Sequence, residues 1–212
     1  MFERASAGMP IIAENGAYIA CGGIQLAATP LDRQVVAAVI SLFRDNGGET
    51  CSSGVVMCGS QAAYVERADE AFLAEVGKYF VELFVVDDLL SVSTDVLKIA
   101  VFDFSDASYP LSILQRFRLS HQVVASGPHW VDVVAQNANK GTAVRFQQRR
   151  FGTSPAQTIV FGDYVNDLEM LDTADHSFAI ANAHAAVLDR ARHVAPSLVE
   201  HGVITTLRGV FG

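Results

Sequence analysis

The chain has 212 residues, with 15 Lys+Arg against 23 Asp+Glu, which gives a formal net charge of −8. Nucleic acids and anionic membranes select basic surfaces, so this balance argues against either as the main partner. Half of the residues are hydrophobic and only 18% are charged, which excludes global disorder. The length allows one large domain or two small ones.

The sequence predicts a cytoplasmic protein. The longest uncharged stretch, residues 15–31, contains glycines and a proline, so it does not resemble a membrane span of roughly 20 apolar residues. The chain begins Met-Phe-Glu-Arg, without the apolar region of a secretory signal. The chain has an odd number of cysteines, Cys21, Cys51 and Cys58, and they lack the CxxC spacing of metal ligands. We therefore expect reduced, packed thiols.

The first two thirds of the chain mix helical and strand patterns. An apolar run at residues 10–13 precedes Asn15-Gly16, a pair typical of a tight turn between strands. Apolar residues at helical spacing predict helices over 34–45, capped by Asp32 and stopped by Gly47-Gly48, and over 68–80. Strand-like runs occupy residues 54–57, 81–86, 97–104, 122–125 and 130–135. We interpret residues 20–136 as an inserted α+β unit.

The C-terminal third alternates regularly between strand and helix. The pattern predicts a helix over 142–151, strands over 158–161 and 177–181, and helices from Asn166 and after Asn182. Such alternation with short connections implies a parallel sheet covered by helices.

Asp163 gives the strongest chemical signal. It follows Gly162 at the carboxyl end of a predicted buried strand, where open α/β sheets bind their ligands. A carboxylate there suits a hard cation. Helix capping is the alternative: Asn166 as N-cap, with Glu169 three residues later, would explain Asn166 and Asp167 but not Asp163.

Lys140 gives the second signal, because a lysine before the helix 142–151 opposes the helix dipole unless an anion binds there. A solvated lysine in a turn remains the alternative. Asp103 ends another apolar run, but the alternation of Ile99, Val101 and Asp103 favours a half-exposed strand over a catalytic nucleophile.

Together these segments resemble the haloacid dehalogenase (HAD) superfamily, in its branch of Cof-like phosphatases. The matching segments, in the family's order, are residues 10–19, Asn139-Lys140-Gly141, residues 162–171, residues 181–183 and residues 200–203. The resemblance implies an α/β fold with a Rossmann-like parallel-sheet core, formed here by residues 1–19 and 137–212. Residues 20–136 would then be the α/β cap domain.

The resemblance also implies an enzyme, a phosphoric monoester hydrolase that uses Mg²⁺ and an aspartyl-phosphate to act on a small phosphorylated metabolite such as a sugar phosphate. Carried onto this chain, Asp163 would bind the magnesium ion and Asp167 would support the metal shell. Lys140 would neutralise the phosphate, and Asn166 would contact substrate or phosphate. Asn15 and Asn182 would line the substrate pocket.

One departure qualifies this expectation. The family opens with a strand ending in DxD, followed by a strand ending in Ser or Thr, and residues 1–10 show no counterpart of either motif. Three explanations stay open: a truncated phosphatase, which we favour; an inert relic or phosphate-ligand-binding protein; or a chain completed by a strand-donating partner or by a second copy in a homo-oligomer.

Overall fold

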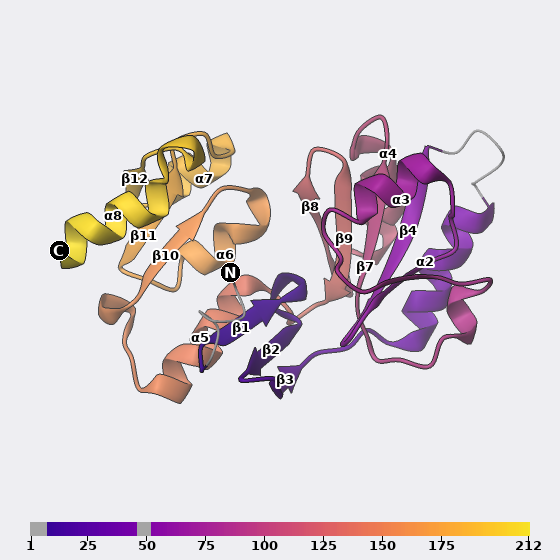
Figure 1. The fold of residues 1–212 in the computed structure, drawn as a ribbon, viewed down its shortest axis with the longest axis horizontal. Coiled ribbons are helices and arrows are strands. Elements are labelled where there is room, and N and C mark those ends of the chain that lie inside the picture. Colours follow the sequence, from indigo (N-terminus) through magenta and orange to yellow (C-terminus); the bar gives the residue numbers. More distant parts are fainter. Residues whose placement is uncertain (1–7, 46–51) are drawn as a thin grey trace. The chain divides into compact units, whose positions relative to one another are not determined.

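The computed structural model describes residues 8–45 and 52–212. These residues form two compact units, and the chain passes from the first to the second between Ala138 and Asn139. Figure 1 shows a large mixed sheet with its helices in the first unit and an alternating strand–helix arrangement in the second. Each unit has its own buried apolar clusters.

A six-stranded sheet with the order β6-β5-β4-β7-β9-β8 dominates the first unit. The strands are β4 (Ser53–Gly59), β5 (Ala63–Val65), β6 (Leu83–Val85), β7 (Val96–Asp103), β8 (His121–Gly127) and β9 (Trp130–Ala135). The helices of this unit are α2 (Arg33–Asp45), α3 (Glu70–Val76) and α4 (Ser108–Leu114).

Helices cover both faces of this sheet, which explains why its central strand β7 is apolar almost throughout. Ile99 and Val101 of β7 belong to the cluster that α2 and α4 complete. Ala100 and Phe102 belong to the opposite cluster, which α3 completes through Phe72. A side chain at Gly54 of β4 would begin 2.2 Å from the Phe72 ring, so α3 can pack this closely only over glycine.

A three-stranded antiparallel meander precedes this sheet: β1 (Pro10–Ala13), β2 (Tyr18–Cys21) and β3 (Ile24–Ala28). The predicted tight turn is confirmed, because a 3-10 turn over Glu14–Gly16 joins β1 to β2. Glu14, Asn15 and Gly16 all adopt positive φ, of 50°, 54° and 95°. Only glycine takes this conformation without cost, so two neighbouring non-glycine residues need support from the fold.

The second unit is the predicted parallel α/β arrangement. β10 (Ile159–Gly162), β11 (His176–Ile180) and β12 (His193–Ala195) pair in parallel, with β11 in the centre. The helices are α5 (Lys140–Phe151), α6 (Leu168–Leu171), α7 (Ala185–Arg190) and α8 (Gly202–Phe211). Val160, Ala179 and Val187 lie in its buried cluster, against which residues of α5 and α6 pack.

The structure corrects several local predictions. The helix expected over 68–80 ends at Val76, because Gly77 caps it and the chain then turns. Asp103 does not lie on a half-exposed strand: it is 1% exposed and accepts hydrogen bonds from Ser52 and Ser53. The predicted α2 and its Asp32 cap are confirmed, while Gly47-Gly48 lies outside the described residues.

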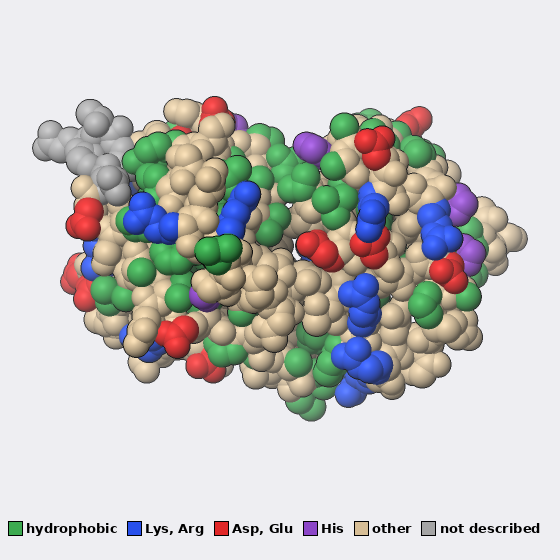
Figure 2. All heavy atoms as spheres, turned by 180° about the vertical axis from the view of Figure 1, so that it is seen from behind, with side chains coloured by type: hydrophobic (Ala, Val, Ile, Leu, Met, Phe, Trp, Pro, Cys, Tyr) green, Lys and Arg blue, Asp and Glu red, His purple; other side chains and the backbone are tan. Residues whose placement is uncertain are grey.

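The surface in Figure 2 mixes charged and hydrophobic side chains. Acidic and basic side chains are interspersed among hydrophobic ones on the face shown in Figure 2. Cys21 and Cys58 are free thiols, and Cys51 lies outside the described residues. Over residues 8–45 and 52–212, no helix has the length and apolarity needed to cross a membrane.

Candidate functional site

The candidate site begins where β10 ends. Gly162 is the last residue of the strand, Asp163 follows, and the chain turns into a 3-10 turn over Val165–Asp167 (η5) before α6. A Cβ atom at Gly162 would lie 2.8 Å from the Cβ of Asp167. Glycine at this position therefore allows the Asp167 side chain to fold back beneath the strand end.

Asp167 holds this turn together. Its Oδ2 accepts hydrogen bonds from the backbone N–H of Asp163 at 2.9 Å and of Tyr164 at 3.3 Å. Its Oδ1 accepts a hydrogen bond from Lys140 Nζ at 2.5 Å. The capping interpretation of Asn166 was therefore wrong: the capping carboxylate is Asp167, and Asn166 lies within the turn.

Lys140 lies in the first turn of α5, because the helix begins at this residue, two residues earlier than the sequence pattern predicts. The side chain of Asn139 caps this helix by accepting the Thr142 N–H at 2.7 Å. A Cβ at Gly141 would lie 2.3 Å from the Glu169 carbonyl oxygen, so this glycine lets α5 approach α6 closely. Lys140 is 29% exposed, which leaves its ammonium accessible to a ligand while Asp167 orients it.

Asp163 offers an exposed carboxylate beside the buried carboxylate of Asp167. Partial desolvation, followed by the negative charge of Asp167, raises the pKa of the Asp163 carboxyl above its usual value. A bound cation would relieve this repulsion, and carboxylate oxygens are the donors that Mg²⁺ prefers. Over the described residues, no group of three or more acidic, His or Cys side chains gathers to hold a metal. Asp163 and Asp167 therefore offer Mg²⁺ suitable oxygen atoms but do not by themselves complete a ligand set.

The structure brings a third segment to this point. The backbone N–H of His184, in the loop that follows β11, donates to the Asp163 carbonyl oxygen at 2.9 Å. Asn182 is exposed in the same loop. Hydrogen bonds within the second unit therefore connect Asp163 to Asp167, Asp167 to Lys140, and Asp163 to the loop that contains Asn182.

Asn15 has a different environment, in the first unit. Its Nδ2 donates to Asp132 Oδ2 at 2.6 Å, and Lys98 Nζ lies 2.9 Å from Glu14 Oε2 and 3.6 Å from Asp132 Oδ2. Burial alone would lower the pKa of Lys98, but the facing carboxylates outweigh it and raise that pKa. Sequence reasoning missed Lys98 and Asp132, although a charge inside each apolar strand was a visible signal.

The comparisons with known proteins agree with this geometry. The haloacid dehalogenase-like hydrolase family matches residues 1–207. The 5-amino-6-(5-phospho-D-ribitylamino)uracil phosphatase YbjI of Escherichia coli is 26% identical over 92% of this chain and 72% of its own length.

Solved structures show the same fold. SMU.1108c of Streptococcus mutans superposes with a TM-score of 0.87 at 22% identity, covering 99% of this chain and 79% of its own. The HAD subclass IIB sugar phosphatase BT4131 superposes with a TM-score of 0.79 at 18% identity, covering 95% and 75%. YbjI and BT4131 are Cof-like phosphatases of the haloacid dehalogenase superfamily. This chain has the Rossmann-like α/β fold and belongs to the haloacid dehalogenase-like hydrolases.

Proposed function

We propose that this chain is a magnesium-dependent phosphatase that hydrolyses a small phosphorylated metabolite, such as a sugar phosphate, through an aspartyl-phosphate. The observation that carries the proposal is the joining of Lys140, Asp167 and Asp163 at the carboxyl end of β10. The acidic strand end suits a divalent cation, and the lysine beside it suits a phosphate.

Each residue then has a definite task. The Lys140 ammonium binds phosphate oxygens and offsets their negative charge, while Asp167 fixes its direction. Asp163 would hold a Mg²⁺ ion, which would supply positive charge to offset that of the phosphate, and Asp167 supports Asp163 by accepting its backbone N–H. Asn166 and Asn182 contact the substrate. Asn15 lines the pocket for its organic part.

We also propose the domain division and location that the sequence suggests. Residues 1–19 and 137–212 would form the core and residues 20–136 the cap, in a cytoplasmic protein without a nucleic-acid or membrane partner. Among the described residues, no third carboxylate gathers with Asp163 and Asp167. We propose that the carboxylate that attacks phosphorus is supplied from elsewhere, and a homo-oligomer or a strand-donating partner is one source for it.

A phosphate-ligand-binding protein without catalysis is the second candidate. Among the described residues, no third carboxylate, His or Cys side chain gathers with Asp163 and Asp167, whereas a magnesium ion takes about six ligands. Such a site would bind phosphate through Lys140 yet hold the ion weakly.

Magnesium-dependent hydrolysis of p-nitrophenyl phosphate tests the proposal. We expect Asp163→Ala to lower turnover at least about 100-fold, the scale of removing one charge-stabilising group. Asp189→Ala removes an exposed carboxylate of α7 in the same unit and should leave turnover unchanged. Equal turnover in Asp163→Ala and the original chain would contradict the proposal. No turnover in any of the three would show that this chain alone does not hydrolyse the ester, as expected of the binding protein or of a truncated phosphatase.

A further inference from the structure

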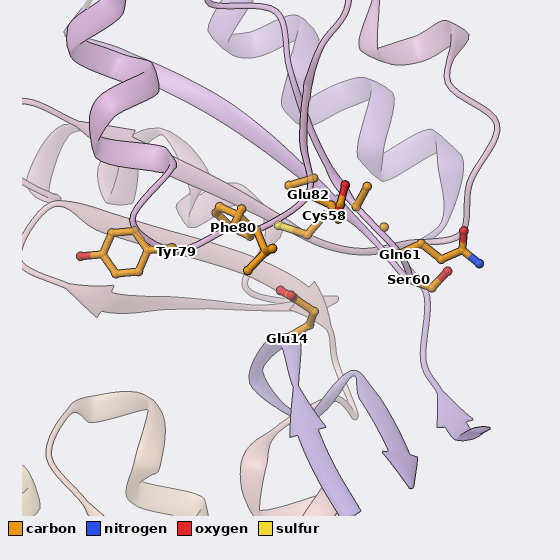
Figure 3. A pocket seen from close by; sticks show the side chains of 11 residues that line it. Glu14, Cys58, Ser60, Gln61, Tyr79, Phe80 and Glu82 are labelled. Carbon is orange, nitrogen blue, oxygen red and sulfur yellow. The ribbon is translucent and has the colours of Figure 1, made fainter. Parts of the chain in front are cut away.

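A cavity of about 230 Å³ lies wholly within the first unit, beside the connection from β4 to β5 (Figure 3). Three segments line it: Glu14 in the turn after β1, Ser60 and Gln61 after β4, and the stretch from Tyr79 to Glu82 after α3. Drug-sized ligands occupy pockets of roughly 300–1,000 Å³. This cavity therefore suits a group of monosaccharide size or smaller.

The charge of the lining is negative. Glu14 and Glu82 both line the cavity, and the residues that the structure places around it include neither Lys nor Arg. The nearby Lys98 is 14% exposed and is shared between Glu14 and the buried Asp132. Burial raises the pKa of the Cys58 thiol, which keeps this lining residue neutral. Carboxylates thus outnumber cations around the cavity.

The remaining lining groups suit a polar organic cation. Tyr79 is 63% exposed, and Phe80 follows it along the wall. The ring of Phe80 already has one ammonium near it, because Lys98 Nζ lies 5.8 Å from its centroid. Ser60 and Gln61 supply hydroxyl and amide groups that can bond to ligand hydroxyls. Figure 3 shows the Glu14 carboxylate pointing from the turn toward Phe80 and Cys58.

We propose that this cavity binds an organic group that carries a protonated amine and hydroxyls, with Glu14 and Glu82 selecting its positive charge. The inference goes beyond the proposed function and is independent of it, because the cavity lies within the first unit, whereas Lys140 and Asp163 lie in the second. Metabolites with a carboxylate or a second phosphate at this position would be rejected by like charge.

The single tryptophan of the chain provides a readout that needs no catalysis. The ring of Trp130 lies 5.3 Å from that of Tyr79, centroid to centroid, so occupancy of the cavity should change its fluorescence. The probes are glucosamine, glucose and glucuronate, titrated into the full chain. We expect glucosamine to bind roughly tenfold more tightly than glucose, with no saturable change for glucuronate.

Gln61→Lys tests the charge without disturbing the core, because Gln61 is exposed. This variant should weaken glucosamine binding at least about tenfold and should restore binding of glucuronate. Glu70→Gln is the matched control: it changes an exposed charge on α3, outside the cavity lining, and should leave all three titrations unchanged. Glucuronate binding as tightly as glucosamine, or an unaltered preference in Gln61→Lys, would overturn the proposal.

Lys140→Met separates this inference from the proposed function. Since the probes carry no phosphate, the variant should bind glucosamine as the original chain does, even if phosphatase activity proves absent. A loss of glucosamine binding in Lys140→Met would contradict a site contained in the first unit.

Discussion

Lys98 and Lys140 each lie beside carboxylates, and their settings differ. Lys98 projects from the middle of β7, is 14% exposed, and lies between Glu14 and the 4%-exposed Asp132. Lys140 lies in the first turn of α5, is 29% exposed, and contacts Asp167 at 2.5 Å. The first ammonium is enclosed by its partners, whereas the second retains an open side.

The difference separates a structural charge from a functional one. Removing either partner of an enclosed pair leaves an uncompensated buried charge, so we expect Lys98 to stabilise the fold. A lysine at a helix N-terminus is electrostatically unfavourable and gains from binding an anion. We therefore expect substitutions around Lys98 to change stability first, and substitutions around Lys140 to change ligand binding first.

Lys98→Met should have the largest effect on stability. It leaves the carboxylates of Glu14 and Asp132 without their cation and should lower the free energy of unfolding by about 3–5 kcal/mol. Guanidinium unfolding followed by circular dichroism measures this. Lys78→Met removes an exposed i,i+3 partner of Glu75 and should cost less than about 0.5 kcal/mol. Similar losses of unfolding free energy in both variants would contradict the assignment of Lys98 as a buried structural charge.

Asp167→Ala should come next. The backbone N–H groups of Asp163 and Tyr164 lose their acceptor, which should cost about 2–3 kcal/mol of unfolding free energy. The control is Asp172→Ala, which breaks an exposed pair with Arg190 and should cost at most about 1 kcal/mol. An unchanged unfolding midpoint in Asp167→Ala would show that this carboxylate does not organise the strand end.

Gly141→Ala sharpens the comparison by moving the helix that carries Lys140. The new Cβ would lie 2.3 Å from the Glu169 carbonyl oxygen, so α5 must shift, at a cost of about 1–3 kcal/mol. Gly209→Ala, on α8 in the same unit, meets no atom within 4 Å and should gain about 0.5–1 kcal/mol. Thermal unfolding of the two variants should therefore shift in opposite directions; a shared direction would refute this account of Gly141.

Asp103 should have the smallest effect on stability. Its buried carboxylate is stabilised by serine hydroxyl groups, whereas the carboxylates beside Lys98 and Lys140 are stabilised by a cation. Burial would raise the pKa of its carboxyl, but hydrogen bonds from Ser53 and Ser52 outweigh it and lower that pKa. A lowered folded-state pKa gives stability that is present above the unfolded-state value, near 3.8, and is lost as the pH falls through the folded-state value.

Asp103→Asn should therefore flatten the loss of stability below about pH 4, where the original chain loses about 1 kcal/mol from this group. Urea midpoints measured between pH 6 and pH 3 test this. If the urea midpoint of Asp103→Asn fell as steeply with decreasing pH as that of the original chain, Asp103 would not be the cause of the acid sensitivity.

Much of this arrangement could be predicted from sequence where the pattern is local. The alternation of strand and helix patterns in the last third correctly predicted the parallel strands β10 and β11. The pair Asn15-Gly16 correctly predicted the turn after β1. Helix α3 ended early because Gly77 outweighed the apolar spacing that continues to Phe80.

Long-range partners could not be predicted in the same way. No local pattern shows that Asp132 would meet Lys98, or that the Asp103 carboxylate would be enclosed by serines about fifty positions away. At the candidate site, sequence reasoning selected Lys140, Asp163 and Asp167. Only the folded chain shows that Asp167 contacts both of the others.

Calorimetric titration of inorganic phosphate, with and without Mg²⁺, tests the central claim most directly. The account predicts binding that strengthens when Mg²⁺ is present. In Lys140→Met, phosphate affinity should fall at least about tenfold under both conditions. In Asp163→Asn, the magnesium-dependent part alone should disappear. Unchanged phosphate affinity in both variants would contradict the assignment of this strand end as the phosphate and metal site.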